Sequence, residues 1–450
     1  MPGTGATIEA DPIEADYVVI GAGAMGMAFT DVILTHTDAT VAIVDRHDKP
    51  GGHWNDAYPF VRLHQPSAFY GVDSAELGSN RIDEIGGNAG LSELASGAEV
   101  CAYFDQVMQR RFLPSGRVVH HPRSVYADGV VTSMPTGRST SVRVGRRLVD
   151  ATYMNVTVPS MRPPSYAVAD GVRVIPPNGL PSADHPDGGY VIVGAGKTAI
   201  DAVLWLLDRG VDPADITWIT PRDSWLLNRA VIQPGDGFRF NEQFEVLAAA
   251  DSAEAVYLGM EEAGHFLRID PSVEPTMYRC ATVTEAELTQ LRRVSDGIVR
   301  QGRVERVEPE ALVLESGTLS RPPGTLYVDC SADGLARRPA VPVFADDRLT
   351  LQTVRACQQV FSAALIARVE ADRSLDLDAA NALTGVIPHP DVPRDFLSGA
   401  LAHIANGQQW LGHDGLLSWL VETRLSPDGP AADPTAVVRA AANLQRFLAE

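Results

Sequence analysis

Cysteine is scarce in this chain of 450 residues. Its four cysteines are scattered, and no two lie close enough in sequence to form a local redox pair or a zinc-binding pattern: Cys101, Cys280, Cys330 and Cys357. This spacing argues against a dithiol reductase. It predicts four reduced cysteines, with no disulfide and no metal site.

Long apolar runs and basic charge are also in short supply. No apolar run approaches the length of a membrane span, and residues 1–15 carry neither the basic nor the apolar region of a signal peptide. We expect a flexible leader there and a cytoplasmic protein. Acidic residues outnumber basic ones by 57 to 37, giving a formal net charge of −20, which disfavours nucleic acid or an anionic membrane as a partner. The content of 45% hydrophobic and 21% charged residues is typical of a globular protein, long enough here for two or three domains.

Two glycine-rich loops are the most informative feature that is present. The first reads Gly21-Ala22-Gly23-Ala24-Met25-Gly26, and the second reads Gly194-Ala195-Gly196-Lys197-Thr198-Ala199. Each follows a short apolar run and precedes a stretch with helical periodicity, which is the context of a dinucleotide-binding turn. Glycine lets the backbone turn tightly and approach a pyrophosphate at the helix N-terminus. The pair predicts two dinucleotides; a glycine-rich turn in another kind of α/β sheet is the alternative.

The residue that ends the next strand differs between the two loops. After the first loop, the strand over residues 40–44 ends at Asp45, followed by Arg46, and an acid there can accept hydrogen bonds from an adenosine ribose. After the second loop, the strand over residues 216–220 ends without an acid, at Pro221 and Arg222. An arginine in this place can pair with a 2′-phosphate, so Arg222 favours NADPH over NADH. A surface arginine is the alternative interpretation.

A loop rich in glycine and aromatic residues follows the first unit, over residues 51–70. It contains the following candidate binding residues: Gly52, His53, Trp54, Tyr58, Arg62 and His64. Backbone without side chains can lie close to a flat ring system, and aromatic faces can pack against it. An aromatic loop that only packs against the protein is the alternative.

The order of these parts, a G-G-x-W loop shortly after the ribose acid and then Y-P-x-x-R, resembles the class B flavin monooxygenases. These include Baeyer–Villiger, flavin-containing and N-hydroxylating monooxygenases. The resemblance implies an α/β fold with two Rossmann-like dinucleotide-binding domains, of the three-layer ββα kind, and a helical C-terminal extension. It also implies that the first loop and Asp45 hold the ADP half of FAD, that residues 51–70 lie along the isoalloxazine ring, and that NADPH binds at the second loop.

The same resemblance predicts how the chain is divided. We expect residues 16–165 to form the first part of the FAD-binding domain and residues 186–320 to form the NAD(P)H-binding domain, with a substrate-side insertion over 230–300. Residues 321–450 are expected to return to the FAD-binding domain and to end in helices. Helical patterns cover 349–368 and 437–448, and a hairpin pattern covers 303–314.

Arg62 and His64 are the predicted catalytic residues. His64 stands where the resembling sequences often carry an acid, so it can hydrogen-bond the flavin edge or move a proton; a structural histidine is the alternative. Arg62 can balance the charge of the reduced flavin or its peroxide, unless it only pairs with solvent. Asp333 is either a partner of the ribityl chain or a turn-forming residue.

Two departures from the family pattern limit the prediction. The F-x-G-x-x-x-H-x-x-x-W/Y fingerprint is absent between Pro159 and Gly194, and the late turn reads Cys-Ser-Ala-Asp-Gly over 330–334 in place of Ala-Thr-Gly. We therefore predict a divergent, NADPH-using flavin monooxygenase that transfers oxygen from dioxygen to a small or medium organic substrate through a flavin peroxide. A flavin oxidoreductase without oxygen transfer and a flavin-binding protein without catalysis are the alternatives.

Overall fold

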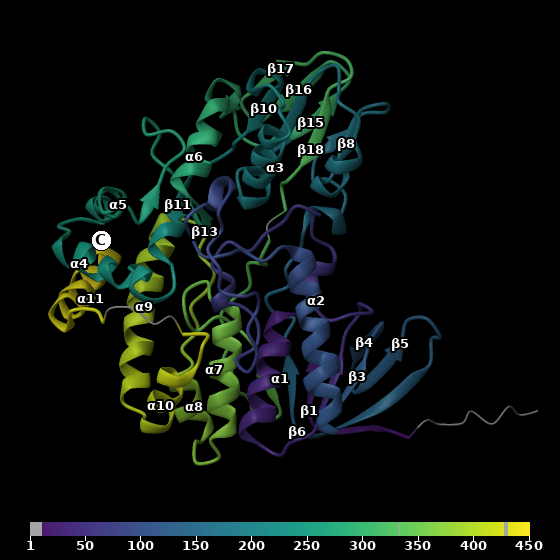
Figure 1. Ribbon diagram of the computed structural model, residues 1–450, viewed down its shortest axis with the longest axis vertical. Helices are drawn as coiled ribbons and strands as arrows, with labels where there is room; N and C mark the ends of the chain where they lie inside the picture. The colour runs from purple at the N-terminus through teal and green to yellow at the C-terminus, as the bar shows by residue number, and fades with distance from the viewer. Residues whose placement is uncertain (1–10, 333, 427–430) are drawn as a thin grey trace, which may run out of the picture.

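Two parallel sheets, each with helices on one face and a smaller antiparallel layer on the other, make up most of the molecule (Figure 1). The computed structural model describes residues 11–332, 334–426 and 431–450. Asp333 lies outside the described residues. This architecture confirms the α/β fold with two Rossmann-like units that the glycine loops predict.

The first sheet has the parallel order β3-β2-β1-β6, and β19 also pairs with β6. Its strands are β1 (Ile13–Ile20), β2 (Val41–Val44), β3 (Val118–His121), β6 (Ser139–Asp150) and β19 (Arg348–Thr350). Helices α1 (Ala24–His36), α2 (Gly97–Val107) and α7 (Gln359–Ala371) cover one face. Strands β4 (Ser124–Ala127) and β5 (Val130–Ser133) extend the first residues of β6 into an antiparallel layer.

Alternation along the strands explains these layers. Tyr17 and Val19 of β1 pack towards the helices, whereas Val18 between them packs towards the antiparallel layer. Strand β1 begins at Ile13, which pairs with Val142 of β6. The prediction of a leader over 1–15 is therefore wrong for residues 13–15, which are strand.

The second sheet has the parallel order β14-β10-β9-β18-β8. Its strands are β8 (Arg173–Ile175), β9 (Tyr190–Val193), β10 (Ile216–Ile219), β14 (Ile298–Val299) and β18 (Leu326–Asp329). Helices α3 (Lys197–Asp208) and α6 (Glu285–Leu291) pack on one face. The other face carries the small sheet of β7 (Ala167–Val168), β15 (Val304–Glu308), β16 (Ala311–Leu314) and β17 (Gly317–Ser320), which includes the predicted hairpin.

Strand β18 corrects the predicted boundary between the units. It pairs along its whole length with β9, from Leu326 beside Tyr190 to Asp329 beside Val193. The expectation that the chain has already returned to the first unit at residue 321 is therefore wrong at this strand. Each sheet contains a short, fully buried apolar strand, β2 in the first and β9 in the second, so a strand such as β18 carries no local sign of its sheet.

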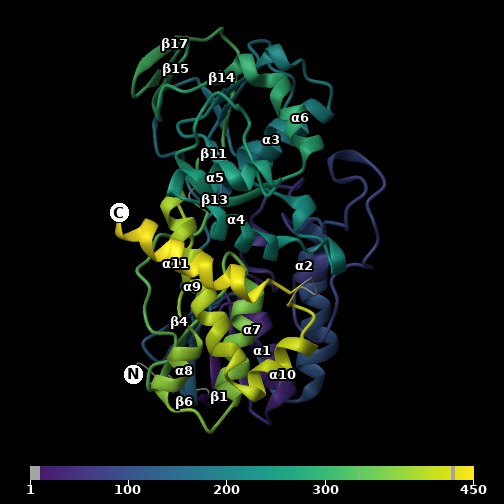
Figure 2. The same cartoon turned by 90° about the vertical axis from the view of Figure 1, so that its left-hand side faces the viewer.

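A third group of elements joins the 230–300 region to the C-terminal helices. It contains β11 (Ser224–Asn228), β12 (Phe266–Leu267) and β13 (Met277–Val283), with helices α4 (Gln243–Ala249) and α5 (Ala253–Glu262). Figure 2 shows α9 (Pro393–Leu411) and α11 (Pro434–Ala449) beside these elements. One buried apolar cluster joins them, with Phe244 and Phe266 contributed by the 230–300 region and Phe396 and Leu444 by the C-terminal helices.

In the C-terminal region, the start of one helix was predicted at the wrong residue. Residues 348–350 form β19 and helix α7 begins only at Gln359, so the helix predicted over 349–368 starts ten residues too early. Helix α11 confirms the helix predicted over 437–448. The remaining helices are α8 (Leu377–Leu383) and α10 (Asp414–Glu422). Among the described residues, no helix has the length and apolar character needed to cross a membrane.

Candidate functional site

The first glycine loop forms a cradle at the start of helix α1. Gly21 has a φ of 105°, a left-handed value that favours glycine. A Cβ on Gly26 would overlap the carbonyl oxygen of Gly21, so this glycine allows the helix to pack closely on its strand. A Cβ on Gly23 would meet the backbone of Gly52 at 3.5 Å, an ordinary van der Waals distance. Gly23 lines a cavity beside the helix N-terminus, a position that suits an anionic ligand.

A cavity of about 330 Å³ lies against this cradle, and we call it the first cavity. It is lined by most of the residues predicted to hold the ADP half of FAD: Gly21, Gly23, Ala24, Met25, Asp45, Arg46 and Gly52. Arg46 is half-exposed and lies 3.9 Å from Asp56. The structure thus brings these predicted residues together around one space.

Asp45 is held in place by three hydrogen bonds. Its carboxylate accepts bonds from the backbone N–H of Ala22 at 2.5 Å, the backbone N–H of His47 at 2.7 Å and Nδ1 of His47 at 3.0 Å. Burial opposes its ionisation, but the hydrogen bonds from His47 and Ala22 outweigh burial and lower the pKa of Asp45. An ionised carboxylate has further lone pairs to accept a ribose hydroxyl.

A second cavity, of about 410 Å³, adjoins the first, and His53, Val156 and Gln359 line both. Its wall includes four of the candidate binding residues predicted in the ring-binding loop, namely His53, Trp54, Tyr58 and His64. It also includes Gly196, Lys197 and Thr198 of the second glycine loop. Gly194 instead packs beside the backbone of Cys330. The two loops that the sequence separates by more than a hundred residues therefore meet in one space.

Hydrogen bonds fix the aromatic wall of the second cavity. The indole N–H of Trp54 donates to the hydroxyl of Tyr70 at 2.8 Å, and the ring of His53 stacks on Trp54 with centroids 5.2 Å apart. The hydroxyl of Tyr58 donates to Asp201 of helix α3 at 2.6 Å, and Asp201 also pairs with Lys197. Tyr58 thus links the ring-binding loop to the second glycine loop.

Burial favours the neutral form of two histidines that the ring-binding loop contributes to this wall, His53 and His64. Burial lowers the pKa of His53 to about 4. Burial, reinforced by the charges of Lys197 and Arg229, holds the pKa of His64 well below its usual value. A neutral imidazole can donate one hydrogen bond and accept another from a ligand in the cavity, but it brings no positive charge to that ligand.

Two predicted arginines lie away from the second cavity. Arg62 is exposed and lines neither cavity; its Nε donates to the carbonyl oxygen of Leu94 at 3.0 Å. It sits in an extended segment between the buried Val61 and Leu63, and alternation turns its side chain the other way. The structure does not bring Arg62 together with His64.

Arg222 is occupied by an ion pair. Its two terminal nitrogens lie 3.2 and 3.1 Å from the carboxylate oxygens of Asp391. Arg279 and Arg337 also pair with Asp391, at 3.5 and 2.9 Å. Asp391 therefore sits among three guanidinium groups, and its pKa is lowered by them even though burial alone would raise it.

Sequence reasoning missed the polar residues at the start of helix α7. Arg355, Gln358 and Gln359 line the second cavity, and the helix directs the positive end of its dipole there. Burial lowers the pKa of Arg355 to about 10, so the guanidinium stays charged at neutral pH. Among the described residues, the side-chain oxygen of Gln358 and Nδ1 of His403, both in this wall, are buried without a hydrogen-bond partner. Placing the helix start at residue 349 hid this group.

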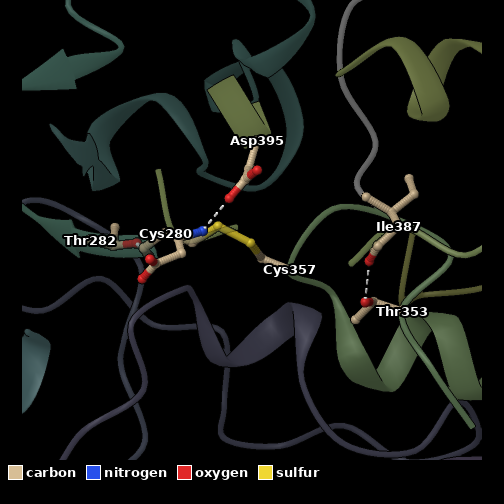
Figure 3. Close-up of a disulfide and its surroundings, with 7 residues drawn as sticks. Cys280, Thr282, Thr353, Cys357, Ile387 and Asp395 are labelled. Atoms are coloured by element: carbon tan, nitrogen blue, oxygen red, sulfur yellow. Dashed lines mark hydrogen bonds between the residues drawn. A yellow bond between two sulfur atoms is a disulfide. The ribbon is translucent and has the colours of Figure 1, made fainter. Parts of the chain in front are cut away.

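A disulfide overturns the prediction of four reduced cysteines. Cys280 of β13 is bonded to Cys357, two residues before α7, across 77 residues of sequence (Figure 3). Only the fold brings them together, so their sequence spacing could not reveal the pair. Cys101 and Cys330 are free thiols. Both bonded cysteines line the second cavity, and a ring nitrogen of His389 and the two sulfur atoms all lie within 4.8 Å of one another.

No known family model matches the chain. Uncharacterized proteins of Mycobacterium tuberculosis and Mycobacterium bovis are each 53% identical to it over 424 residues, covering 93% of this chain and 78% of the relative. Their length and identity establish a common family with the present chain.

Solved structures of flavin monooxygenases are similar in fold. A steroid monooxygenase bound to NADP is 14% identical and matches 96% of this chain and 97% of its own, with a TM-score of 0.51. A polycyclic ketone monooxygenase from Thermothelomyces thermophila is 12% identical and matches 98% of this chain and 89% of its own, with a TM-score of 0.51. Cyclohexanone monooxygenase from Rhodococcus sp. Phi1, bound to NADP+, is 13% identical and matches 81% of this chain and 84% of its own, with a TM-score of 0.50. The fold implied by the sequence resemblance is thereby confirmed.

Proposed function

We propose a function from this premise: the chain belongs to the same protein family as its mycobacterial relatives, and it has the fold of the class B flavin monooxygenases. It is an FAD-dependent, NADPH-using monooxygenase that oxygenates a small or medium organic substrate. The observation that carries this proposal is the shared second cavity, whose wall combines the ring-binding loop with the second glycine loop.

The first cavity fits the ADP half of FAD. Gly23 leaves space over the N-terminus of α1 for the pyrophosphate, and Asp45 offers an ionised carboxylate to the ribose. Because His53, Val156 and Gln359 line both cavities, a molecule bound in the first can extend its ring into the second. When bound there, FAD supplies a hydride acceptor and a ring that reacts with dioxygen.

The wall of the second cavity suits a flavin ring that becomes negatively charged when reduced. Arg355 and the N-terminus of α7 provide positive charge, and the unpaired amide oxygen of Gln358 is available as a hydrogen-bond acceptor. Trp54 and Tyr70 offer aromatic faces. Neutral His53 and His64 can hydrogen-bond the ring or hold a proton. Arg62 has no part in this proposal, because it lines neither cavity.

The second glycine loop is proposed to bind NADPH. Gly196 lies at the N-terminus of α3, and no described atom is within 4 Å of the position of its Cβ, which leaves room for a pyrophosphate. Lys197 and Thr198 line the same cavity as the ring-binding loop, so a nicotinamide bound from this side can reach the flavin. Arg222 is proposed to exchange Asp391 for the 2′-phosphate of the nucleotide.

Measuring which products receive the oxygen atoms of dioxygen tests the proposal. The FAD-loaded protein is reduced by NADPH without air, mixed with isotopically labelled dioxygen and offered sulfides, amines and ketones. We expect label in an oxygenated product and a matching fall in hydrogen peroxide. Full recovery of the electrons as hydrogen peroxide with every compound, or no reaction with dioxygen, would favour an oxidoreductase without oxygen transfer.

A further inference from the structure

We propose that the Cys280–Cys357 disulfide is a second redox centre, which accepts the two electrons of the reduced flavin and becomes a pair of thiols. This inference rests on the proposed binding of FAD, but it adds an electron acceptor that a monooxygenase reaction does not require. The product is a dithiol inside the protein, able to pass electrons on to an external disulfide.

The position of the disulfide carries the inference. Cys357 lies two residues before the first residue of α7, Gln359, which lines both cavities. Cys280 lies on β13, and its neighbours Ala281 and Thr282 line the second cavity as well. The bond therefore belongs to the wall of the space into which the flavin ring is proposed to extend.

His389 is one polar residue beside the bond. Its ring nitrogen and the two sulfur atoms are within 4.8 Å of one another, and burial lowers the pKa of His389 to about 4. The neutral ring can exchange hydrogen bonds with a new thiol, and it brings no positive charge beside the sulfur atoms. The free Cys330 provides a contrast: it also lines the second cavity, but burial raises the pKa of its thiol well above the usual value, and it has no bonded partner.

The step balances as a two-electron exchange. Two electrons leave the reduced flavin, which returns to its oxidised form, and the bond between the sulfur atoms breaks. The sulfurs take up two protons, one released by the reduced flavin and one from solvent. NADPH, the proposed donor to the flavin, supplies the electrons.

The bond also joins two parts of the fold. Cys280 belongs to the sheet packed against the C-terminal helices, and Cys357 leads into a helix of the first unit. Reduction removes this covalent link from the wall of the cavity. The state of the disulfide therefore bears on the shape of the proposed site as well as on its electron content.

An anaerobic reductive titration tests the inference. The FAD-loaded protein is titrated with dithionite, thiols are blocked with iodoacetamide after denaturation, and peptides containing Cys280 and Cys357 are analysed by mass spectrometry. We expect the wild type to take up two two-electron equivalents per flavin, with both cysteines becoming alkylated. The Cys280→Ser/Cys357→Ser double variant is expected to take up one, whereas Cys101→Ser, outside both cavities, is expected to behave as the wild type.

A second arm separates electron transfer through the flavin from direct reduction. The flavin-free protein treated with the same dithionite is expected to keep its disulfide. Complete flavin bleaching after one equivalent, with both cysteines still bonded, would overturn the inference and leave the proposed function intact. Cysteines that are already alkylated before reduction, or a metal ion bound by Cys280, Cys357 and His389 as thiolates, would also overturn it. Failure to bind any FAD would defeat the proposed function together with the inference.

Discussion

The two glycine-rich loops share a motif but differ in what surrounds them. The first contains three glycines, is approached by the backbone of Gly52, and has an anchored acid in Asp45. The second has Ala199 at the position of the third glycine, and its next strand ends without an acid, followed by Arg222, which is paired with Asp391. The first loop lines the first cavity, whereas Gly196, Lys197 and Thr198 of the second loop line the second cavity together with the aromatic residues of the ring-binding loop. This difference fits our proposal that the first loop holds FAD and the second binds NADPH.

Blocking the first loop is expected to have the largest effect. Gly23→Val adds a side chain at a residue that lines the first cavity, and its Cβ meets the backbone of Gly52 at 3.5 Å, an ordinary van der Waals distance. We expect the purified variant to contain no measurable flavin and to lose all NADPH oxidation. Flavin absorbance per protein, together with circular dichroism, checks this. A folded Gly23→Val protein with a full complement of FAD would show that the first loop is not the flavin site.

The matched change in the second loop is expected to separate binding from reduction. Gly196→Val has open space around its Cβ, so we expect normal FAD content. The side chain would cover the N-terminus of α3, and anaerobic flavin reduction by NADPH is expected to slow by about 100-fold, equivalent to about 2.7 kcal/mol. Stopped-flow absorbance measures the rate, and dithionite reduction serves as the control. Loss of flavin from this variant would break the distinction between the two loops.

Arg222 tests whether the second loop prefers a phosphorylated nucleotide. If it exchanges Asp391 for the 2′-phosphate, Arg222→Ala is expected to weaken NADPH by about tenfold, since one charged hydrogen-bonded contact contributes on the order of 1.5 kcal/mol. NADH is expected to change little. The measurement is the concentration dependence of flavin reduction with each nucleotide, with Arg138→Ala in an exposed turn as the control. Equal losses with both nucleotides would remove Arg222 from the NADPH site.

The smallest expected effect concerns the support of Asp45 by His47. Hydrogen bonding to Asp45, opposed by burial and aided by Asp56, raises the pKa of His47. The contribution of His47 to the free energy of unfolding is therefore complete below the pKa of a histidine in the unfolded chain, about 6.5. This contribution is lost as the pH rises through the raised pKa of His47 in the folded protein. We expect His47→Gln to lower the melting temperature at pH 6 and to match the wild type more closely at pH 9. The difference amounts to about 1 kcal/mol or less. A larger deficit at pH 9 would contradict this sign.

Turns, a hairpin and a helix that are determined by neighbouring residues could be predicted from the sequence. The turns at Gly21 and Gly194, the hairpin of β15 and β16, and helix α11 follow from glycine placement and periodicity. The strand β18 was assigned to the wrong unit because a buried parallel strand carries no mark of its sheet. Alternation, which the sequence does show, could have warned that Arg62 lies on the opposite side from Val61 and Leu63.

The site was predictable on its glycine side and unpredictable on the side formed by distant segments. Asp45, Trp54 and His64 follow the first loop closely in sequence, so their motif revealed them. The positive end of α7 with Arg355, and the disulfide, come from segments more than two hundred residues further on. Only the pairing of sheets and the packing of α7 against α1 bring them to the same cavity.

The central claim is that electrons pass from a nicotinamide at the second loop to a flavin held by the first. Anaerobic mixing of the FAD-loaded protein with NADPH and, separately, with NADH tests this claim most directly. The account predicts that NADPH bleaches the flavin absorbance, faster than NADH does. A flavin that stays bound and oxidised with both nucleotides would contradict the account, and would leave the second glycine loop as a structural turn.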